Sequence, residues 1–321
     1  MRDTDYAYCV ARIRANERYL LTEKDISKLL ESKSYDGALR YLLDKKWIAQ
    51  VGEISECIKY QSKLLWKLLS ESVPDKKELD VLCVVNDFFN IKAAVKCHFT
   101  DRDPADYYIE PTSLDLGKLT ESVSAHKFSS LEGVKGKCAQ ESYKLACLTE
   151  NGQNADIITD RACIDEISFF ATEKGSSVTG EICRFICDTT NIKIAFRCAM
   201  TNKQRDFIET AIGECCAIDR KSLIEATLKG KDVLSEYLCK GVYGEGAKIY
   251  LTCAAEYEKW CDNKVIAIAK KSAYTAFGFD PVCSYYYAKI TEMKTVRIIL
   301  SGLKSGADKN SIKERVRALY V

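Results

Sequence analysis

The chain has 321 residues, of which 47% are hydrophobic and 29% are charged, so it is too apolar for a disordered protein and long enough to bury a sizeable core. Its 48 Lys and Arg side chains against 46 Asp and Glu leave a net charge of +2, which argues against a global electrostatic attraction to nucleic acid or to an anionic membrane. Four prolines and sixteen glycines are few, which disfavours β-sandwiches and propellers and favours long helices.

Apolar residues recur at helical spacing through most of the sequence. Such stretches cover residues 6–20, 26–43 and 54–69, and a further helix is expected over about 77–99. Strict two-residue alternation, which is typical of strands, is nearly absent. We therefore expect an all-α protein with helices of roughly 10–25 residues, and the clearest loop at residues 103–113, which contains two prolines.

The cysteines resemble a disulfide scaffold by number only. Sixteen of them in so long a chain fall below the density of small secreted scaffolds, and no apolar stretch is long enough for a signal peptide or a membrane span. We therefore expect a cytosolic protein with reduced thiols. The closest cysteines, Cys183 with Cys187 and the adjacent Cys215 and Cys216, are interpreted as small buried residues on helices, so no metal site is expected. Two histidines are too few for a His-rich metal centre.

An internal repeat is the most informative feature of the sequence. Its first element is an acidic residue followed by a polar residue three positions later and a basic residue five positions later. The three copies are Asp87–Asn90–Lys92, Asp188–Asn191–Lys193 and, more weakly, Glu292–Thr295–Arg297.

A second element predicts the beginnings of four short helices. It is an Asp followed by an aliphatic residue four positions later and a Glu six positions later, and three copies have Ser or Thr three residues before the Asp, which suits a helix N-terminus. The copies are Asp25–Leu29–Glu31, Asp115–Leu119–Glu121, Asp219–Leu223–Glu225 and Asp308–Ile312–Glu314, and the preceding hydroxyl residues are Thr22, Thr112 and Ser305.

The two elements alternate along the chain in a constant order. This predicts three similar helical lobes around a pseudo-threefold axis, in which the two termini complete one partial unit. The expected lobes comprise residues 1–114, 115–218 and 219–321. The acidic and amide residues of the first element have two interpretations: they join neighbouring helices in the interior, or they contact a partner. Catalysis is not expected of them, because no nucleophile is paired with a base.

No nucleotide-binding, hydrolase or zinc-protease motif is present. The glycine-rich segment 241–246 follows no predicted strand, so it is interpreted as a turn between helices rather than a phosphate-binding loop. Residues 284–321 hold eight basic and three acidic side chains. This excess is either a solvated helix face or a docking patch for an acidic partner.

The two ends of the chain carry the most specific motifs. They are Asp5-Tyr-Ala-Tyr8-x-Val10-Ala-Arg12-Ile-Arg14 at the beginning, and Tyr287-Ala-Lys289-x-x-Glu292 and Ile312-Lys-Glu-Arg315-Val-Arg317 at the end. Through these motifs, and along its whole length, the chain resembles the C subunit of bacterial and archaeal V/A-type ATPases, a relative of the d subunit of the eukaryotic vacuolar ATPase. It departs from that family at Ile290 and Thr295, where the family usually has Glu and Asn.

The resemblance implies a funnel of three helical lobes that has no catalytic residue, cofactor or metal. The family's members sit on the membrane proteolipid ring, receive the central stalk subunits of the D and F type, and transmit torque for coupled ion transport. The protein would then be peripheral on the membrane, without a transmembrane span of its own and without nucleic acid as a partner. The alternative is a generic cytosolic helical scaffold or adaptor. The candidate structural or interface residues are Arg12, Arg14, Asp87, Asn90, Lys92, Asp188, Asn191, Lys193, Glu292, Arg297, Arg315 and Arg317.

Overall fold

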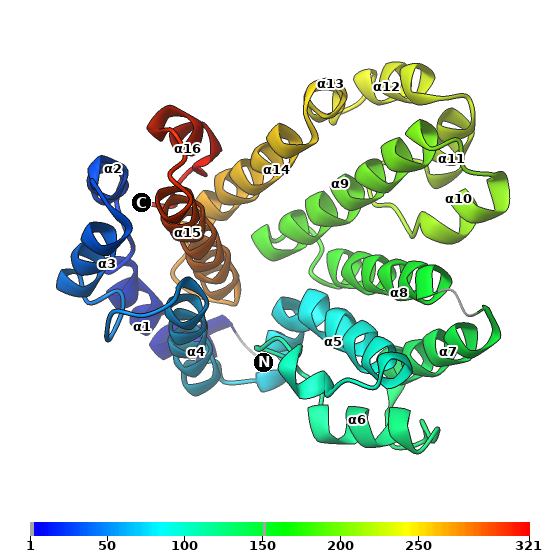
Figure 1. Cartoon of the computed structure of the whole chain (residues 1–321), viewed down its shortest axis with the longest axis horizontal. Coiled ribbons are helices and arrows are strands. Elements are labelled where there is room, and N and C mark those ends of the chain that lie inside the picture. The colour runs from blue at the N-terminus through cyan, green and yellow to red at the C-terminus, as the bar shows by residue number, and fades with distance from the viewer. Residues whose placement is uncertain (1–2, 150–151) are drawn as a thin grey trace. The chain divides into compact units, whose positions relative to one another are not determined.

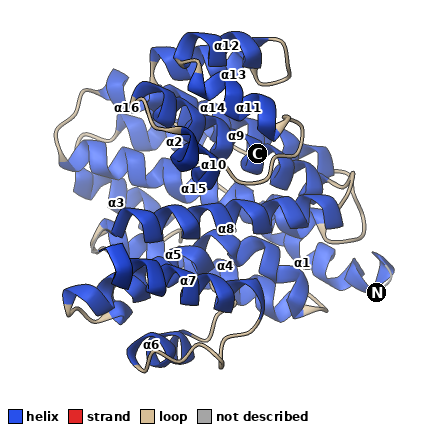
Figure 2. Ribbon diagram, turned by 90° about the vertical axis from the view of Figure 1, so that its right-hand side faces the viewer, coloured by secondary structure: helices blue, strands red, loops and turns tan. Residues whose placement is uncertain are grey.

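The protein is all-α, as predicted. The computed structural model describes residues 3–149 and 152–321, and in these residues helices alternate with turns and no strand is present (Figures 1 and 2). The chain divides into two compact units. The first contains the residues up to Glu78 together with Ser177–Ile182 and Thr252–Val321, and the second contains Leu79–Ser176 and Cys183–Leu251. The three lobes expected at 1–114, 115–218 and 219–321 stay a prediction.

The first unit brings the two ends of the chain together around one long helix, α15, which packs against helices from both ends. Two of its residues, Val296 and Leu300, are 0% exposed, and buried side chains lie on every side of its first turns, as expected where other helices cover it all round. The helices of this unit are α1 (Ala7–Glu17), α2 (Glu23–Glu31), α3 (Tyr35–Asp44), α4 (Ile54–Ser72), α14 (Ala254–Ala269), α15 (Asp280–Lys304) and α16 (Lys309–Arg315).

The last helix, α16, lies directly on α15. Ile312 is buried and reaches Gly302, where an added Cβ would come within 2.6 Å of the Ile312 side chain. The absence of a side chain at Gly302 therefore permits this close approach. The fold of the C-terminal segment consequently depends on apolar packing as well as on its charges.

Helix α2 begins with the capping box that the sequence predicts. Thr22 accepts from the backbone N–H of Asp25, and the Asp25 carboxylate accepts from the backbone N–H of Thr22 at 2.9 Å. The same carboxylate accepts from the Tyr41 hydroxyl and pairs with Lys45, each at 2.6 Å. Although burial alone raises the pKa of Asp25, these donors outweigh it and hold the pKa well below its usual range.

We expect Asp25→Asn to lower the free energy of unfolding by about 1–2 kcal/mol at pH 6. Because the folded-state pKa is depressed, the contribution of the carboxylate is complete above its ordinary pKa of 3.8 and is lost as the pH falls further. Urea unfolding of both proteins between pH 6 and pH 2.5 therefore gives a difference that shrinks below about pH 4. Asp44→Asn, an exposed change at the end of α3, is the control. A difference that stays constant down to pH 2.5 would contradict the depressed pKa.

The second unit is built on α5 and α8, which lie against each other and against α7. Lys96 on α5 pairs with Asp156 on α8 at 2.7 Å, and Lys92 pairs with Asp160 one turn away. The helices of this unit are α5 (Asp80–Thr100), α6 (Leu116–Ser124), α7 (Gly133–Thr149), α8 (Gly152–Glu173), α10 (Arg205–Ala211), α11 (Arg220–Leu228), α12 (Lys231–Cys239) and α13 (Gly244–Thr252).

Helix α9 (Val178–Met200) begins among the residues of the first unit and continues in the second. A distant carboxylate caps its beginning, because Asp280 accepts from the backbone N–H groups of Val178 at 3.0 Å and Thr179 at 2.9 Å. A negative charge at this end also interacts favourably with the helix dipole. The sequence gives no sign of this cap, since the two segments lie about a hundred residues apart.

The four predicted helix beginnings agree with the structure, with one correction. Asp115, Asp219 and Asp308 are themselves the N-caps of α6, α11 and α16. The correction concerns the three hydroxyl residues that precede predicted helix beginnings, Thr22, Thr112 and Ser305. Only Thr22 caps a helix. Thr112 instead donates to Asp87, and Ser305 follows the end of α15.

The predicted loops are largely correct. Residues 103–113 form a loop that contains one short 3-10 turn, Pro104–Asp106. The glycine-rich segment 241–246 is a turn between α12 and α13, as interpreted, although Gly244 already begins α13. Within the described residues, none of the helices combines the length and the hydropathy that a bilayer crossing requires.

Candidate functional site: buried pairs that hold the helix links

The repeated acidic and amide residues lie in the interior and bind the segment that follows a long helix. We call these segments links: link 1 is residues 101–115, link 2 is residues 201–219, and link 3 is residues 18–22 at the beginning of the chain. We call the acidic residue and the residue three positions later a link-binding pair. The pairs are Asp87 with Asn90 for link 1, Asp188 with Asn191 for link 2, and Glu292 with Thr295 for link 3.

In the first pair, Asn90 forms a two-way amide contact with the link backbone. Its Nδ2 donates to the carbonyl oxygen of Ile109 at 3.0 Å, and its Oδ1 accepts from the N–H of the same residue at 2.8 Å. The side chain is 0% exposed, so both of its polar ends are satisfied where water does not reach. Asn90 therefore fixes link 1 against α5 through a single residue.

Asp87 holds the next residues of the same link. Its Oδ1 accepts from the backbone N–H of Ser113 at 2.9 Å and also from the Thr112 hydroxyl. Its Oδ2 accepts from the Ser113 hydroxyl at 2.7 Å and pairs with Nζ of Lys135 at 2.6 Å. The buried carboxylate is thus both hydrogen-bonded and neutralised, which is the condition for keeping a charge in the interior.

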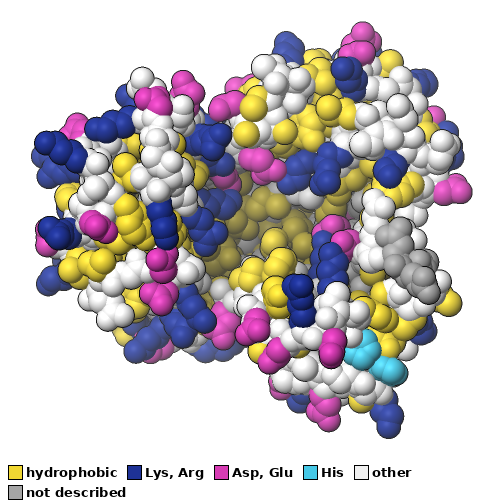
Figure 3. Space-filling view, in the orientation of Figure 1, with side chains coloured by type: hydrophobic (Ala, Val, Ile, Leu, Met, Phe, Trp, Pro, Cys, Tyr) yellow, Lys and Arg dark blue, Asp and Glu magenta, His cyan; other side chains and the backbone are white. Residues whose placement is uncertain are grey.

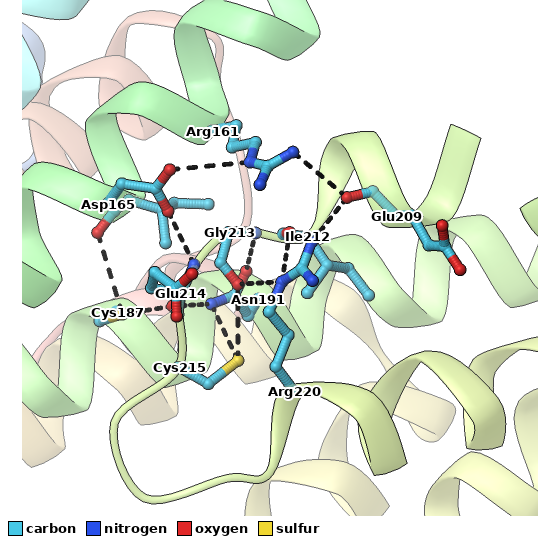
Figure 4. A network of polar contacts seen from close by, with 11 residues as sticks. Arg161, Asp165, Cys187, Asn191, Glu209, Ile212, Gly213, Glu214, Cys215 and Arg220 are labelled. Carbon is cyan, nitrogen blue, oxygen red and sulfur yellow. Dashed lines mark hydrogen bonds and ion pairs between the residues drawn. The ribbon is translucent and has the colours of Figure 1, made fainter. Parts of the chain in front are cut away.

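Asn191 repeats the amide contact in link 2 (Figure 4). Its Oδ1 accepts from the N–H of Gly213 at 3.0 Å, and its Nδ2 donates to the carbonyl oxygen of Glu214 at 2.7 Å. Like Asn90, it is 0% exposed. The same amide chemistry therefore joins a long helix to its link in two places of the second unit.

Asp188 completes the second pair without a directly bonded cation. Its Oδ1 accepts from the N–H of Cys216, and its Oδ2 accepts from the N–H of Ala217 and from the Tyr243 hydroxyl, each at 2.8 Å. Burial raises the pKa of Asp188, although these three donors act in the opposite direction. The Lys135 ammonium group balances the charge of Asp87, whereas Asp188 accepts hydrogen bonds from two backbone N–H groups and one phenol.

Other charged side chains hold the remaining carbonyl and N–H groups of link 2 (Figure 4). Arg220 donates to the carbonyl oxygens of Ile212 at 2.8 Å and Glu209 at 2.6 Å, which caps the end of α10. Asp165 on α8 accepts from the N–H of Glu214 at 2.7 Å. Link 2 is therefore held from α8 and α9 and by the first residue of α11.

In the third pair only Glu292 binds a link, and this link is the beginning of the chain instead of the segment that follows α15. Glu292 accepts from the backbone N–H of Leu21 at 2.5 Å and from Nε1 of Trp47 at 2.7 Å. The adjacent buried Lys289 pairs with it at 2.5 Å and lies over the Trp47 ring. The beginning of the chain thus supplies the link for its last long helix.

Thr295 is the exception among the amide positions. It is 0% exposed, and its hydroxyl has no hydrogen-bond partner in the described residues, whereas Asn90 and Asn191 at the same position are fully bonded. Where the other two pairs have an Asn that bonds the link backbone, this pair has a buried hydroxyl that forms no hydrogen bond within the described residues.

We expect Thr295→Val to leave the free energy of unfolding unchanged or to raise it by up to about 1 kcal/mol, because a buried hydroxyl without a partner carries a desolvation cost. The matched control is Thr227→Val. Thr227 is also buried, but its hydroxyl, unlike that of Thr295, has a partner, because it donates to the carbonyl oxygen of Leu223 at 2.7 Å. Urea unfolding of both variants measures the difference. A loss of more than about 1 kcal/mol in Thr295→Val would mean that the hydroxyl has a partner.

The basic members of the first element lie outside the buried pairs. Lys92 pairs with Asp160 across α5 and α8, Lys193 is half-buried on α9, and Arg297 is exposed on α15. The first repeat element therefore consists of two parts: an interior pair that holds a link, and a basic side chain nearer the surface.

The predicted basic patch at the C-terminal end is smaller than its composition indicates. Four of its eight basic residues are paired with carboxylates: Lys289 with Glu292, Lys294 and Arg317 with Asp262, and Lys304 with Glu53. The exposed basic side chains that remain outside these pairs are Arg297, Lys309, Lys313 and Arg315. We call these four the exposed basic group.

The two arginines at the beginning of the chain have contacts within the first unit. Arg14 donates to the carbonyl oxygens of Ser272 at 2.6 Å and Thr275 at 3.2 Å, which ties α1 to the segment before α15. Arg12 lies 3.4 Å from Glu71 of α4. Arg14 therefore joins two distant parts of the sequence.

The two histidines, which are distant in sequence, lie together in space (Figure 3). The rings of His98 and His126 are 5.3 Å apart, and both lie against the Tyr143 ring. In the described part of the chain neither belongs to a group of side chains placed to hold a metal ion. The pair is an aromatic contact.

The site as a whole joins secondary structure rather than presenting reactive groups. Its carboxylates and amides are turned toward backbone N–H and C=O groups, and no nucleophile is paired with a base in the contacts described above. Asp87, Asn90, Asp188 and Asn191 lie in the interior against link backbone, and a contact of these residues with a partner stays a prediction. The repeat in the sequence predicts the positions of these pairs but gives no sign of Arg220, Asp165 and Trp47, which bind from other parts of the chain.

Comparison with known proteins identifies the family of the chain. The family model described as the ATP synthase (C/AC39) subunit matches residues 9–315. The chain is also similar to the C subunit of the V-type sodium ATPase of Enterococcus hirae, with 21% identity over 300 residues that cover 92% of this chain and 89% of that protein. The match spans both units and all three link-binding pairs, and the protein therefore belongs to the ATP synthase (C/AC39) subunit family.

Proposed function

We propose that this protein is the non-catalytic C subunit of a rotary V-type ATPase, which connects the central stalk to the membrane proteolipid ring. The observation that carries the proposal is the family match over residues 9–315, together with the similarity to the C subunit of a V-type sodium ATPase over 92% of the chain. In this role the protein transmits torque between ATP hydrolysis and ion transport and performs no chemistry of its own.

The physical properties of the chain support a mechanical role. A connector under torque has to resist bending where helices meet, and these junctions are where the buried pairs lie. Asp87, Asn90, Asp188 and Asn191 are each 0% exposed and bonded to link backbone. Buried bonds of this kind restrict local opening, because water cannot replace them while the helix stays packed.

The proposal is tested by binding to two separate partners. The purified chain is mixed with a complex of the D- and F-type stalk subunits and, separately, with a detergent-solubilised proteolipid ring of the same source. We expect it to bind both and to restore ATP-driven ion transport to vesicles that lack it. A generic helical adaptor would bind neither, and that result would overturn the proposal.

The exposed basic group is the docking surface that we propose for one of these partners. Deleting the last helix would be a poor test, since Ile312 and Leu319 are buried. The triple variant Lys309→Glu, Lys313→Glu and Arg315→Glu changes only exposed charges. We expect at least a roughly tenfold loss of affinity for the partner that meets this face, with a strong dependence on salt.

The matched control reverses two exposed lysines of α7, Lys137→Glu and Lys144→Glu. We expect it to keep both affinities. Unchanged binding of the triple variant to both partners would exclude the exposed basic group as a docking surface while leaving the connector role to the binding test.

A further inference from the structure

Two cysteines for which the sequence indicates only a packing role meet beside Asp188, and Cys216 lies in link 2 rather than on a helix as predicted. The sulfur atoms of Cys187 on α9 and Cys216 in link 2 and a carboxylate oxygen of Asp188 all lie within 4.8 Å of one another. Cys187 is 0% exposed, whereas Cys216 is half-buried. Cys216 is therefore the more exposed of the two residues, and the buried Cys187 sulfur lies close to its sulfur atom.

The cluster is a poor metal site. Both oxygens of Asp188 already accept hydrogen bonds, from the N–H of Cys216, the N–H of Ala217 and the Tyr243 hydroxyl, each at 2.8 Å. That leaves two sulfur ligands, while a structural zinc ion requires four ligands. The geometry fits chemistry between the two sulfur atoms better than coordination.

The surroundings make the two thiols unequal. The Cys187 thiol donates to the carbonyl oxygen of Glu214 at 3.1 Å. The nearby Cys187 thiol and the Ser168 hydroxyl at 3.7 Å lower the pKa of Cys216, although burial acts in the opposite direction. The contact with Cys216, together with burial, raises the pKa of Cys187. Cys216 therefore ionises more readily than Cys187, which assigns it the role of the attacking thiol and assigns Cys187 that of the resolving thiol.

We propose that Cys187 and Cys216 are an oxidation site at which hydrogen peroxide closes an intramolecular disulfide. The Cys216 thiolate attacks one peroxide oxygen, the O–O bond breaks, and the departing hydroxide takes a proton to become water. The resulting Cys216 sulfenic acid is attacked by the Cys187 sulfur. The S–S bond forms as the S–O bond breaks, and the Cys187 proton leaves with the second water. Two thiols give up two electrons to one peroxide.

The disulfide would join link 2 covalently to α9 beside the residue that already holds it. Asp188 bonds the N–H of Cys216 itself, so the two atoms that react are carried by segments that are positioned before oxidation. The modification would therefore lock the link without requiring a large movement.

The test uses the reduced, purified full-length chain treated with hydrogen peroxide, alkylated and digested. We expect mass spectrometry to show one peptide pair linked through Cys187 and Cys216 with the loss of two hydrogens. In Cys187→Ala, we expect dimedone to trap a sulfenic acid on Cys216. The exposed thiols Cys239 and Cys253 should stay alkylatable under the same treatment.

The matched control is Cys215→Ser, which changes the neighbouring thiol and should leave the disulfide intact, while circular dichroism verifies that each variant folds. A linkage through Cys183 or Cys215 in place of Cys216 would overturn the assignment. So would the absence of any disulfide in the folded protein, or a stoichiometric metal ion that protects both thiols.

Discussion

Asp87→Ala is expected to lower the free energy of unfolding by about 3–5 kcal/mol, as measured by urea denaturation. The substitution removes the carboxylate that lies 2.6 Å from Nζ of Lys135, and it leaves the N–H of Ser113 without its acceptor. The Lys135 side chain is only 15% exposed, so solvent compensates the uncovered charge poorly. The charge that remains, rather than the bond that is lost, accounts for most of the effect.

The double variant Asp87→Ala with Lys135→Met separates these two contributions. Because it removes both charges, we expect it to recover at least about half of the lost stability. An ion pair nearer the surface serves as the comparison. Lys92→Ala breaks the pair with Asp160, whose side chain is 56% exposed, and we expect it to lower the free energy of unfolding by less than about 1 kcal/mol. A double variant no more stable than Asp87→Ala alone would show that the buried charge is not the cause.

Asn191→Ala is expected to lower the free energy of unfolding by about 2–4 kcal/mol and to expose link 2 to proteases in the native state. The change leaves the N–H of Gly213 without its acceptor and leaves the carbonyl of Glu214 with the Cys187 thiol as its donor. Because Asn191 is the side chain that bonds both of these backbone groups, local opening of the link should increase before the rest of the unit unfolds.

The effect of Asn191→Ala is measured in two ways. Urea unfolding gives the change in the free energy of unfolding, and limited proteolysis identifies the site that is cleaved first. We expect the first cut within residues 201–219. The control Asn154→Ala changes an exposed Asn on α8 and should alter neither reading. If Asn191→Ala were cleaved first elsewhere, the link would be held by Asp165 and Arg220 without help from the amide.

The helical architecture could be predicted from the sequence because its evidence is local. Spacing of apolar residues, the scarcity of proline and glycine, and the box at Thr22 and Asp25 each act within one or two turns. The position of the link-binding pairs could also be predicted, since Asp87, Asn90 and their second copy stand at the same spacing. The repeat marked these residues even though it did not show what they bind.

The remaining contacts could not be predicted, because they join segments that only the folded chain brings together. Asp280 caps α9 from about a hundred residues away, and Arg14 reaches the carbonyl of Ser272. The net charge of the C-terminal end does not show which of its basic side chains are paired, so the choice between a solvated helix face and a docking patch stays a prediction. Lys289 pairs with Glu292, which lies three residues away on the same helix face.

The link-binding pairs act mainly on backbone N–H and C=O groups, which every residue except proline carries in full. The three bound stretches, around Ile109 to Ser113, Gly213 to Ala217 and Leu21, share no common sequence. Recognition of the backbone does not depend on side-chain identity, so the links are free to change their surface chemistry while their path over the helices stays the same. Thr112 and Ser113 are exceptions, because their hydroxyls donate to Asp87. The scaffold is therefore suited to exchanging the outer faces of its links, by mutation or by design, at little cost to the helices that carry them.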